Sequence, residues 1–114
     1  MKLPPPNPAA VKLLDRFAPD RPGVVVKKLF GQPAAFLNGN LFFGVFGDDL
    51  FVRLSEDDLQ AAHQVPGSRP FEPMAGRAMR GYCILPEAVW RDEVTARRWV
   101  DRARRFAATL PPKG

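Results

Sequence analysis

The chain has 114 residues, of which 46% are hydrophobic and 25% are charged. A chain of this length buries about two-thirds of the surface that its unfolded form exposes, and the composition excludes intrinsic disorder. No apolar run approaches the roughly 20 residues that span a bilayer, and the start lacks the apolar core of a signal peptide. A single cysteine, Cys83, excludes an intrachain disulfide and a multi-cysteine metal site. These features predict one cytoplasmic domain that has no contact with a membrane.

The charge is strongly basic and uneven. The net charge is +5 and the sequence pI is about 10.0. Residues 58–114 carry ten basic and six acidic side chains, and therefore +4 of the surplus. Such a surplus is typical of proteins that bind nucleic acid or another anionic partner, although genomic base bias also enriches arginine. Nucleic-acid binding is therefore one hypothesis for the second half of the chain.

The first elements are a proline-rich leader and a short helix. Because proline fixes φ and removes a hydrogen-bond donor, residues 1–8 are expected to be a flexible leader to a single domain over residues 9–112. Residues 8–18 predict an amphipathic helix, since Val11, Leu14 and Phe17 recur at helical spacing.

The clearest pattern, over residues 23–54, predicts an antiparallel meander. A strand starts at Val24 and is interrupted by Gly31 and Pro33. Asn38-Gly39 lies between two apolar runs and predicts a two-residue hairpin turn, because a type I′ turn needs positive φ at both positions. A further turn is expected at residues 47–49, and the chain returns as a strand over residues 50–54.

The hairpin turn fixes a predicted pairing, Phe36 with Leu41 and Ala35 with Phe42. One face of the next strand would then carry Leu41, Phe43 and Val45, and the other Phe42 and Phe46. Both faces are apolar, so this strand is expected either to be central and covered on both sides or to offer one face to a partner.

The remainder of the chain predicts two helices and one more hairpin. Residues 55–64 form a helix that Ser55 caps. Residues 66–86 are interpreted as the last hairpin of the sheet, extended over 71–74, turning over 75–78 and forming a strand over 80–85. A helical region starts at Pro86, and its apolar residues recur at helical spacing: Ala96, Trp99, Val100, Ala103, Phe106, Ala107 and Leu110.

Residues that carry chemistry are few. His63 is the only histidine and is expected at the surface of a helix, while Cys83 lies in a strand and is expected to be a buried, unreactive thiol. The acidic pairs at 48–49 and 56–58 occupy a turn and a helix N-terminus, where such residues are common. We therefore expect no catalytic residue, no metal and no cofactor, and we expect that the protein is not an enzyme.

Two groups of arginines are candidate contact residues. Arg98, Arg102 and Arg105 recur at i, i+4 and i+7 on one edge of the last helix. They predict either a solvated face whose aliphatic stems cover apolar surface or a set of phosphate contacts. In the predicted last hairpin, the candidates that would line a binding lip are Arg69, Arg77 and Arg80. A small-molecule ligand there is the least favoured hypothesis.

The order of motifs resembles a known family. Residues 24–58, "VVVKKLFGQPAAFLNGNLFFGVFGDDLFVRLSEDD", are similar to the N-terminal domain of the TfoX/Sxy family, in which a basic-Leu-Phe-Gly motif (here 28–31) precedes a hairpin and an "LFFGV" strand. The stretch "RPFEPMAGRAMRGYCILP", followed by a helix with Trp99 and Val100, is similar to the stand-alone members. The resemblance covers residues 9–112.

The resemblance implies a fold and a class of function. It implies an α+β domain in which an N-terminal helix and a long C-terminal helix pack on an antiparallel meander, similar to the type III secretion-chaperone fold. Full-length members regulate natural competence together with the cyclic-AMP receptor protein. The present chain ends at Gly114 and is expected to lack their C-terminal helical domain, so the resemblance leaves a role in competence open. The family has no established catalytic residue to transfer.

Our leading hypothesis from the sequence is a non-catalytic interaction module in bacterial transcription regulation, bound to a protein partner or self-associating as a homodimer. The alternative is direct nucleic-acid binding through the basic C-terminal helix.

Overall fold

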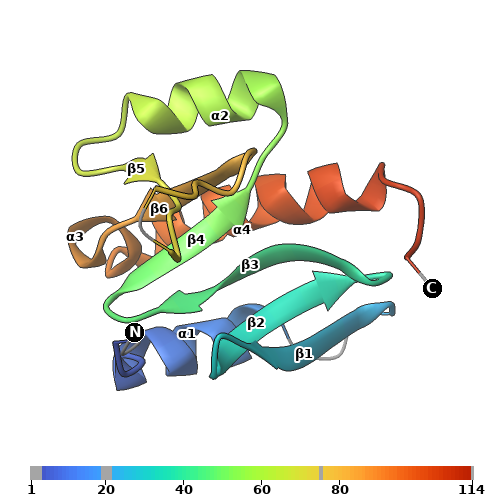
Figure 1. Ribbon diagram of the computed structural model, residues 1–114, viewed down its shortest axis with the longest axis horizontal. Helices are drawn as coiled ribbons and strands as arrows, with labels where there is room; N and C mark the ends of the chain where they lie inside the picture. The colour runs from blue at the N-terminus through green and yellow to red at the C-terminus, as the bar shows by residue number, and fades with distance from the viewer. Residues whose placement is uncertain (1–3, 19–21, 75, 114) are drawn as a thin grey trace.

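The computed structural model describes residues 4–18, 22–74 and 76–113, and they form an α+β domain (Figure 1). Its centre is a six-stranded antiparallel sheet with the order β1-β2-β3-β4-β6-β5. The strands are β1 (Val24–Leu29), β2 (Gln32–Leu37), β3 (Asn40–Phe46), β4 (Asp49–Arg53), β5 (Arg69–Pro70) and β6 (Tyr82–Leu85). The helices are α1 (Pro8–Phe17), α2 (Glu56–His63), α3 (Glu87–Trp90) and α4 (Glu93–Ala108). The predicted fold class is confirmed.

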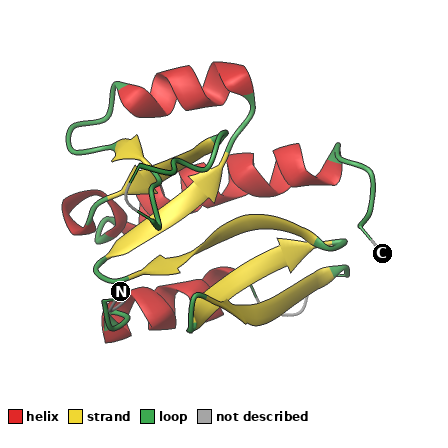
Figure 2. Cartoon of the chain, viewed as in Figure 1, coloured by secondary structure: helices red, strands yellow, loops and turns green. Residues whose placement is uncertain are grey.

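Two helices cover one face of the sheet, as Figure 2 shows. Helix α1 contacts β2 and β3, and α4 contacts β2, β3 and β4. The predicted apolar stripe of α4 faces the sheet: Trp99, Val100 and Ala103 are all buried. The main hydrophobic core lies between these helices and the sheet.

The N-terminal residues are attached to the sheet. Asn7 caps α1, because its side-chain oxygen accepts a hydrogen bond from the backbone N–H of Ala9 at 2.9 Å. The backbone N–H of Asn7 donates to the carbonyl of Gly47 at 2.8 Å, and Gln32 donates to the carbonyl of Pro4 at 3.1 Å. Residues 1–8 were expected to form a flexible leader, but Pro4 and Asn7 hydrogen-bond to the domain and Pro8 is the first residue of α1. Residues 1–3 lie outside the described residues.

The C-terminal helical region is two helices, not one. The predicted helix from Pro86 ends after one turn, because Asp92 adopts an extended conformation and caps α4 by accepting from the N–H of Val94 at 3.2 Å. The short helix α3 places Trp90, which is 1% exposed, beneath the β3–β4 turn.

Two two-residue turns build the first three strands. Asn38 and Gly39 have φ of 50° and 84°, as the predicted type I′ turn requires. Phe30 and Gly31 have φ of 55° and 75°, so the predicted interruption after β1 is a second tight hairpin turn. Residues 24–37 therefore form a hairpin in their own right.

The pairing of β2 with β3 differs from the predicted one because of a β-bulge. Phe36 pairs with Leu41 as expected, but Ala35 pairs with Phe43 and not with Phe42, because the register shifts by one residue between Ala35 and Phe36. Phe42 therefore joins Phe43 in the core under the helices, and the predicted assignment of faces was wrong for Leu41 and Phe42. Leu41 belongs to the core of the opposite face.

The chain itself covers the second face of the sheet. The predicted extended segment 71–74 is not a strand, because β5 is shorter and earlier. Residues 71–74 and 76–81 fold back across the sheet, and the N–H of Arg77 donates to the carbonyl of Met74. Phe71, which is fully buried, stacks on Phe51 with a centroid distance of 4.3 Å and an interplanar angle of 9°. Phe51 in turn packs on Gly44, where a Cβ atom would come within 2.5 Å of its ring. Strand β3 is therefore covered on both faces, one of the two outcomes expected.

Candidate functional site

The arginines predicted as a stripe on α4 have different surroundings. Arg98 and Arg105 are exposed, and neither forms an ion pair within the described part of the chain. The guanidinium of Arg102 lies 4.7 Å from the ring centroid of Trp99, and its Nη1 lies 3.8 Å from a carboxylate oxygen of Asp58. Arg102 therefore bridges α4 to α2, and two of the three predicted contact residues stay open to solvent.

The other edge of α4 uses its arginines in local contacts. The guanidinium of Arg97 lies 4.6 Å from the ring centroid of Phe17 on α1, a cation–π arrangement. Arg104 lies 3.9 Å from Asp101 on the same helix. Arg97 and Arg104 thus each have a local contact, whereas Arg98 and Arg105 have none of these kinds in the described part of the chain.

The three arginines of residues 66–86 do not form one lip. Arg69 lies on β5 and donates to a carboxylate oxygen of Asp49 at 2.6 Å. Arg77 and Arg80 are exposed on the segment that crosses the second face. Of the three, Arg69 lines the cavity formed by the described residues.

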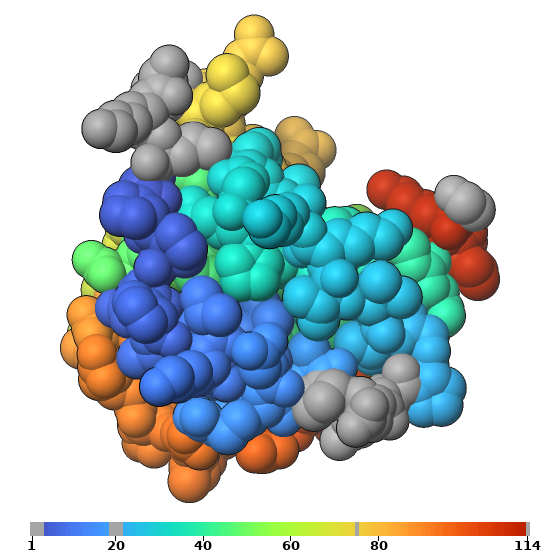
Figure 3. Space-filling view, turned by 90° about the horizontal axis from the view of Figure 1, so that it is seen from below, coloured from blue at the N-terminus to red at the C-terminus, as the bar shows by residue number. Residues whose placement is uncertain are grey.

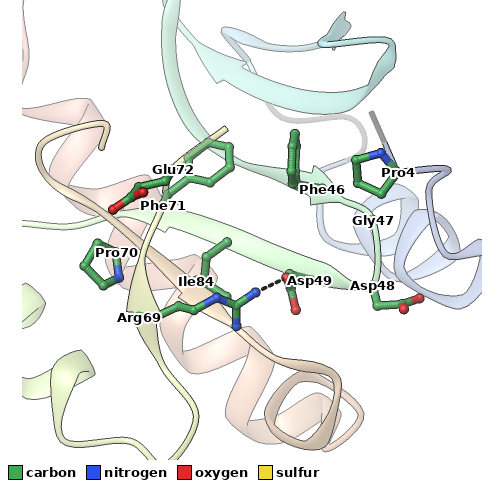
Figure 4. A pocket seen from close by; sticks show the side chains of 10 residues that line it. All are labelled: Pro4, Phe46, Gly47, Asp48, Asp49, Arg69, Pro70, Phe71, Glu72 and Ile84. Atoms are coloured by element: carbon green, nitrogen blue, oxygen red, sulfur yellow. Dashed lines mark hydrogen bonds and ion pairs between the residues drawn. The ribbon is translucent and has the colours of Figure 1, made fainter. Parts of the chain in front are cut away.

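That cavity has a volume of about 630 Å³ and lies between the β3–β4 turn and residues 69–72 (Figure 4). One wall is the Arg69–Asp49 pair, and the rings of Phe46 and Phe71 lie opposite it. Its lining consists of Pro4, Phe46, Gly47, Asp48, Asp49, Arg69, Pro70, Phe71, Glu72 and Ile84. Three carboxyl groups against one guanidinium make the lining as a whole unsuited to an anion.

Burial, only partly offset by Arg69, raises the pKa of Asp49. The Asp49 side chain is 19% exposed, whereas that of Arg69 is 54% exposed. The guanidinium is therefore paired with Asp49 on one side and open to solvent on the other, an arrangement typical of a structural ion pair at the rim of a cavity.

The β3–β4 turn that floors the cavity is held from three directions. The N–H of Gly47 donates to the side-chain oxygen of Gln32 at 2.7 Å, and the carbonyl of Gly47 accepts from the backbone N–H of Asn7. The indole N–H of Trp90 donates to the carbonyl of Asp48 at 2.9 Å. Gln32 is 2% exposed, and its role was missed by the sequence analysis, because a lone glutamine beside a turn gives no pattern.

The two residues considered for catalysis have ordinary surroundings. His63 is exposed in the last turn of α2. Cys83 is fully buried, and burial raises the pKa of its thiol, as the predicted unreactive cysteine requires. Over residues 4–18, 22–74 and 76–113, no three His, Cys, Asp or Glu side chains are grouped to hold a metal ion.

The sheet has one long open edge. Among the described residues, β1 pairs only with β2, and four of its six residues are exposed, among them Val25 at 49% and Val26 at 44%. Figure 3 shows this side of the molecule, where β1 in light blue lies beside α1. The opposite edge, β5, is two residues long and ends in Pro70, so it offers little for strand pairing.

The described residues thus define a small α+β domain with one helix-covered sheet face, one face covered by its own chain, and one open edge. The family model for the TfoX N-terminal domain matches residues 15–107, and the chain belongs to this family. The resemblance predicted from the motifs is confirmed. No significant match was found among curated proteins or among solved structures. None of the helices in the described ranges has the length and apolarity needed to span a bilayer.

Proposed function

We propose that this domain is a non-catalytic, self-associating interaction module that acts in transcription regulation. The observation that carries the proposal is the open edge at β1, a regular strand with two exposed valines. An edge of this kind pairs readily with another strand, and natural sheets usually shorten, bulge or cover it. Membership of the TfoX N-terminal family supports the regulatory context.

The self-association is tested by sedimentation equilibrium of the whole chain from micromolar to roughly millimolar concentration. Pairing along one short strand buries less area than a stable dimer interface, so we expect a weak, concentration-dependent dimer. A single monomeric species over the whole range would refute self-association.

A second candidate function is direct nucleic-acid binding through α4, which the exposure of Arg98 and Arg105 favours. Fluorescence anisotropy with labelled duplex and single-stranded DNA at low and near-physiological salt tests it, because phosphate contacts make binding weaken steeply with salt. Replacing Arg98, Arg102 and Arg105 with glutamate is expected to abolish such binding. Replacing the locally engaged Arg97 and Arg104 with glutamate is the matched control, since it changes charge on the opposite edge.

A further inference from the structure

The hydrogen-bonding direction of β1 follows from its pairing with β2. The N–H of Asn38 donates to the carbonyl of Gly23 at 2.9 Å, one position beyond the Val24–Leu37 pair at which the β1–β2 register begins. In an antiparallel ladder the hydrogen-bonded pairs alternate, so Val25 and Lys27 turn their backbone groups toward β2. Lys28 faces Pro33, which has no N–H to donate, as this alternation requires.

The even-numbered residues of β1 therefore present their backbone to the open edge. Val24, Val26 and Lys28 each direct one N–H and one C=O away from β2. No element of the described structure pairs with these groups. They form a regular row of donors and acceptors, which a second antiparallel strand can satisfy.

We infer that the partner at this edge is a second copy of the chain, paired β1 to β1 with Val26 on the two-fold axis. This inference rests on the proposed self-association and specifies its surface and register. A two-fold axis perpendicular to the sheet joins the two sheets edge to edge and keeps both helix-covered faces on the same side.

The sequence of β1 selects the register. With Val26 on the axis, Val24 faces Lys28 of the second copy and Val25 faces Lys27, so each lysine lies beside a valine. Moving the axis to Lys27 places two lysines directly opposite each other, which is destabilising. Moving it to Val25 leaves Lys28 beyond the paired strand and shortens the ladder. Only the Val26 register combines the longest pairing with separated charges.

The lysines of β1 are compatible with this pairing. The ammonium of Lys27 lies 5.5 Å from the ring centroid of Phe36, so its charge is drawn back over β2. The aliphatic stem of Lys27 remains beside the edge, where it would contact Val25 of the second copy. Lysines on an edge strand usually oppose pairing, and here they also exclude the wrong registers.

The first experiment compares Val26→Pro with Val26→Ala by sedimentation equilibrium. Proline at 26 removes an N–H that points to the open edge, and leaves the bonds to β2 intact, whereas alanine keeps that N–H. We expect Val26→Pro to weaken association by about tenfold or more and Val26→Ala to weaken it less. Dimers that persist unchanged in Val26→Pro would overturn the β1 pairing while leaving self-association standing; a wild-type chain that never associates would overturn both.

The second experiment tests the register and does not depend on the stability of the proline variant. Chains carrying Val25→Cys and chains carrying Lys27→Cys are mixed and oxidised, and the disulfide-linked species are separated by mass. The two positions face each other as a non-hydrogen-bonded pair, whose Cα separation of about 4.5 Å suits a disulfide. The native Cys83 is fully buried and stays out of the reaction. We expect the mixed disulfide to dominate; a majority of 25–25 or 27–27 links would overturn the Val26 register.

Discussion

Replacing Phe71 with alanine should be among the most destabilising single changes in the smaller hydrophobic core, which lies on the sheet face opposite α1 and α4. Phe71 is fully buried, stacks on Phe51 at 4.3 Å, and has edge contacts with Phe46 at 5.4 Å and Phe30 at 6.5 Å. Truncating a buried phenylalanine to alanine costs about 3–5 kcal/mol, and several aromatic partners place Phe71 in the upper half of that range. The free energy of unfolding of a domain this size is about 5–15 kcal/mol, so the loss is a large fraction of the total.

Urea denaturation followed by tryptophan fluorescence measures the change. Phe71→Leu is the companion variant, expected to cost less than Phe71→Ala because it keeps most of the buried volume, and it remains measurable if the alanine variant does not fold. Met74→Ala is the control on the same segment, since Met74 is 53% exposed and should change stability little. A cost below about 1 kcal/mol for Phe71→Ala would show that residues 71–81 do not cover the second face.

Three further predictions concern the turns, the main core and pH. Gly39→Val should lower the melting temperature more than Gly31→Val, although both glycines have positive φ. A Cβ at position 39 would come within 2.4 Å of the Lys113 carbonyl oxygen, whereas a Cβ at position 31 would meet no atom within 4 Å. Equal losses would refute the contact with Lys113. Trp99→Ala should cost about 3–5 kcal/mol in urea denaturation, against almost nothing for Val94→Ala, which replaces a residue 70% exposed on the same helix; a neutral Trp99 variant would contradict the packing of α4. Because burial raises the pKa of Asp49, its contribution to stability is complete below its ordinary value of 3.8 and is lost as the pH rises through the folded pKa. Asp49→Asn should therefore gain stability relative to the wild type as the pH rises from about 3 to about 7, and a pH-independent difference would contradict the raised pKa.

The elements that the sequence predicts correctly are those with a local cause. The Asn38-Gly39 turn follows from the backbone conformation that a two-residue hairpin demands, and the buried face of α4 follows from helical spacing. The break before α4 also had a local signal, because Asp92 precedes Val94 and Thr95 in the manner of an N-cap, and both donate to its carboxylate.

The features that the sequence did not predict depend on contacts between distant residues. The bulge at Phe42 could not be predicted, because the residues of β3 are apolar on both faces. A shift in register therefore leaves the alternation of apolar and polar residues unchanged. The fold-back of residues 71–74 and 76–81 likewise depends on the stacking of Phe71 on Phe51. Phe51 lies in β4, which precedes α2 in the sequence, so the contact joins residues 20 positions apart.

The candidate contact residues show the same division. Helical spacing correctly placed Arg98 and Arg105 at the surface, but it could not show that Arg102 would reach Asp58 on α2. Nor could it separate Arg69, paired with Asp49 at the rim of the cavity, from Arg77 and Arg80 on the exposed loop.

Both end segments of the described chain are tied to the same central strand, at opposite ends of it. Asn7 bonds to Gly47 just after β3, whereas Lys113 donates to the carbonyl of Asn38 just before β3. The seven residues of β3 span ~23 Å, so these segments lie well apart, as their positions in Figure 1 indicate. A circular permutant would therefore need at least about seven residues, native or added, between Asn7 and Lys113. Fluorescent dyes attached near the two segments would report the separation of the ends of β3, and hence unfolding, in single-molecule measurements.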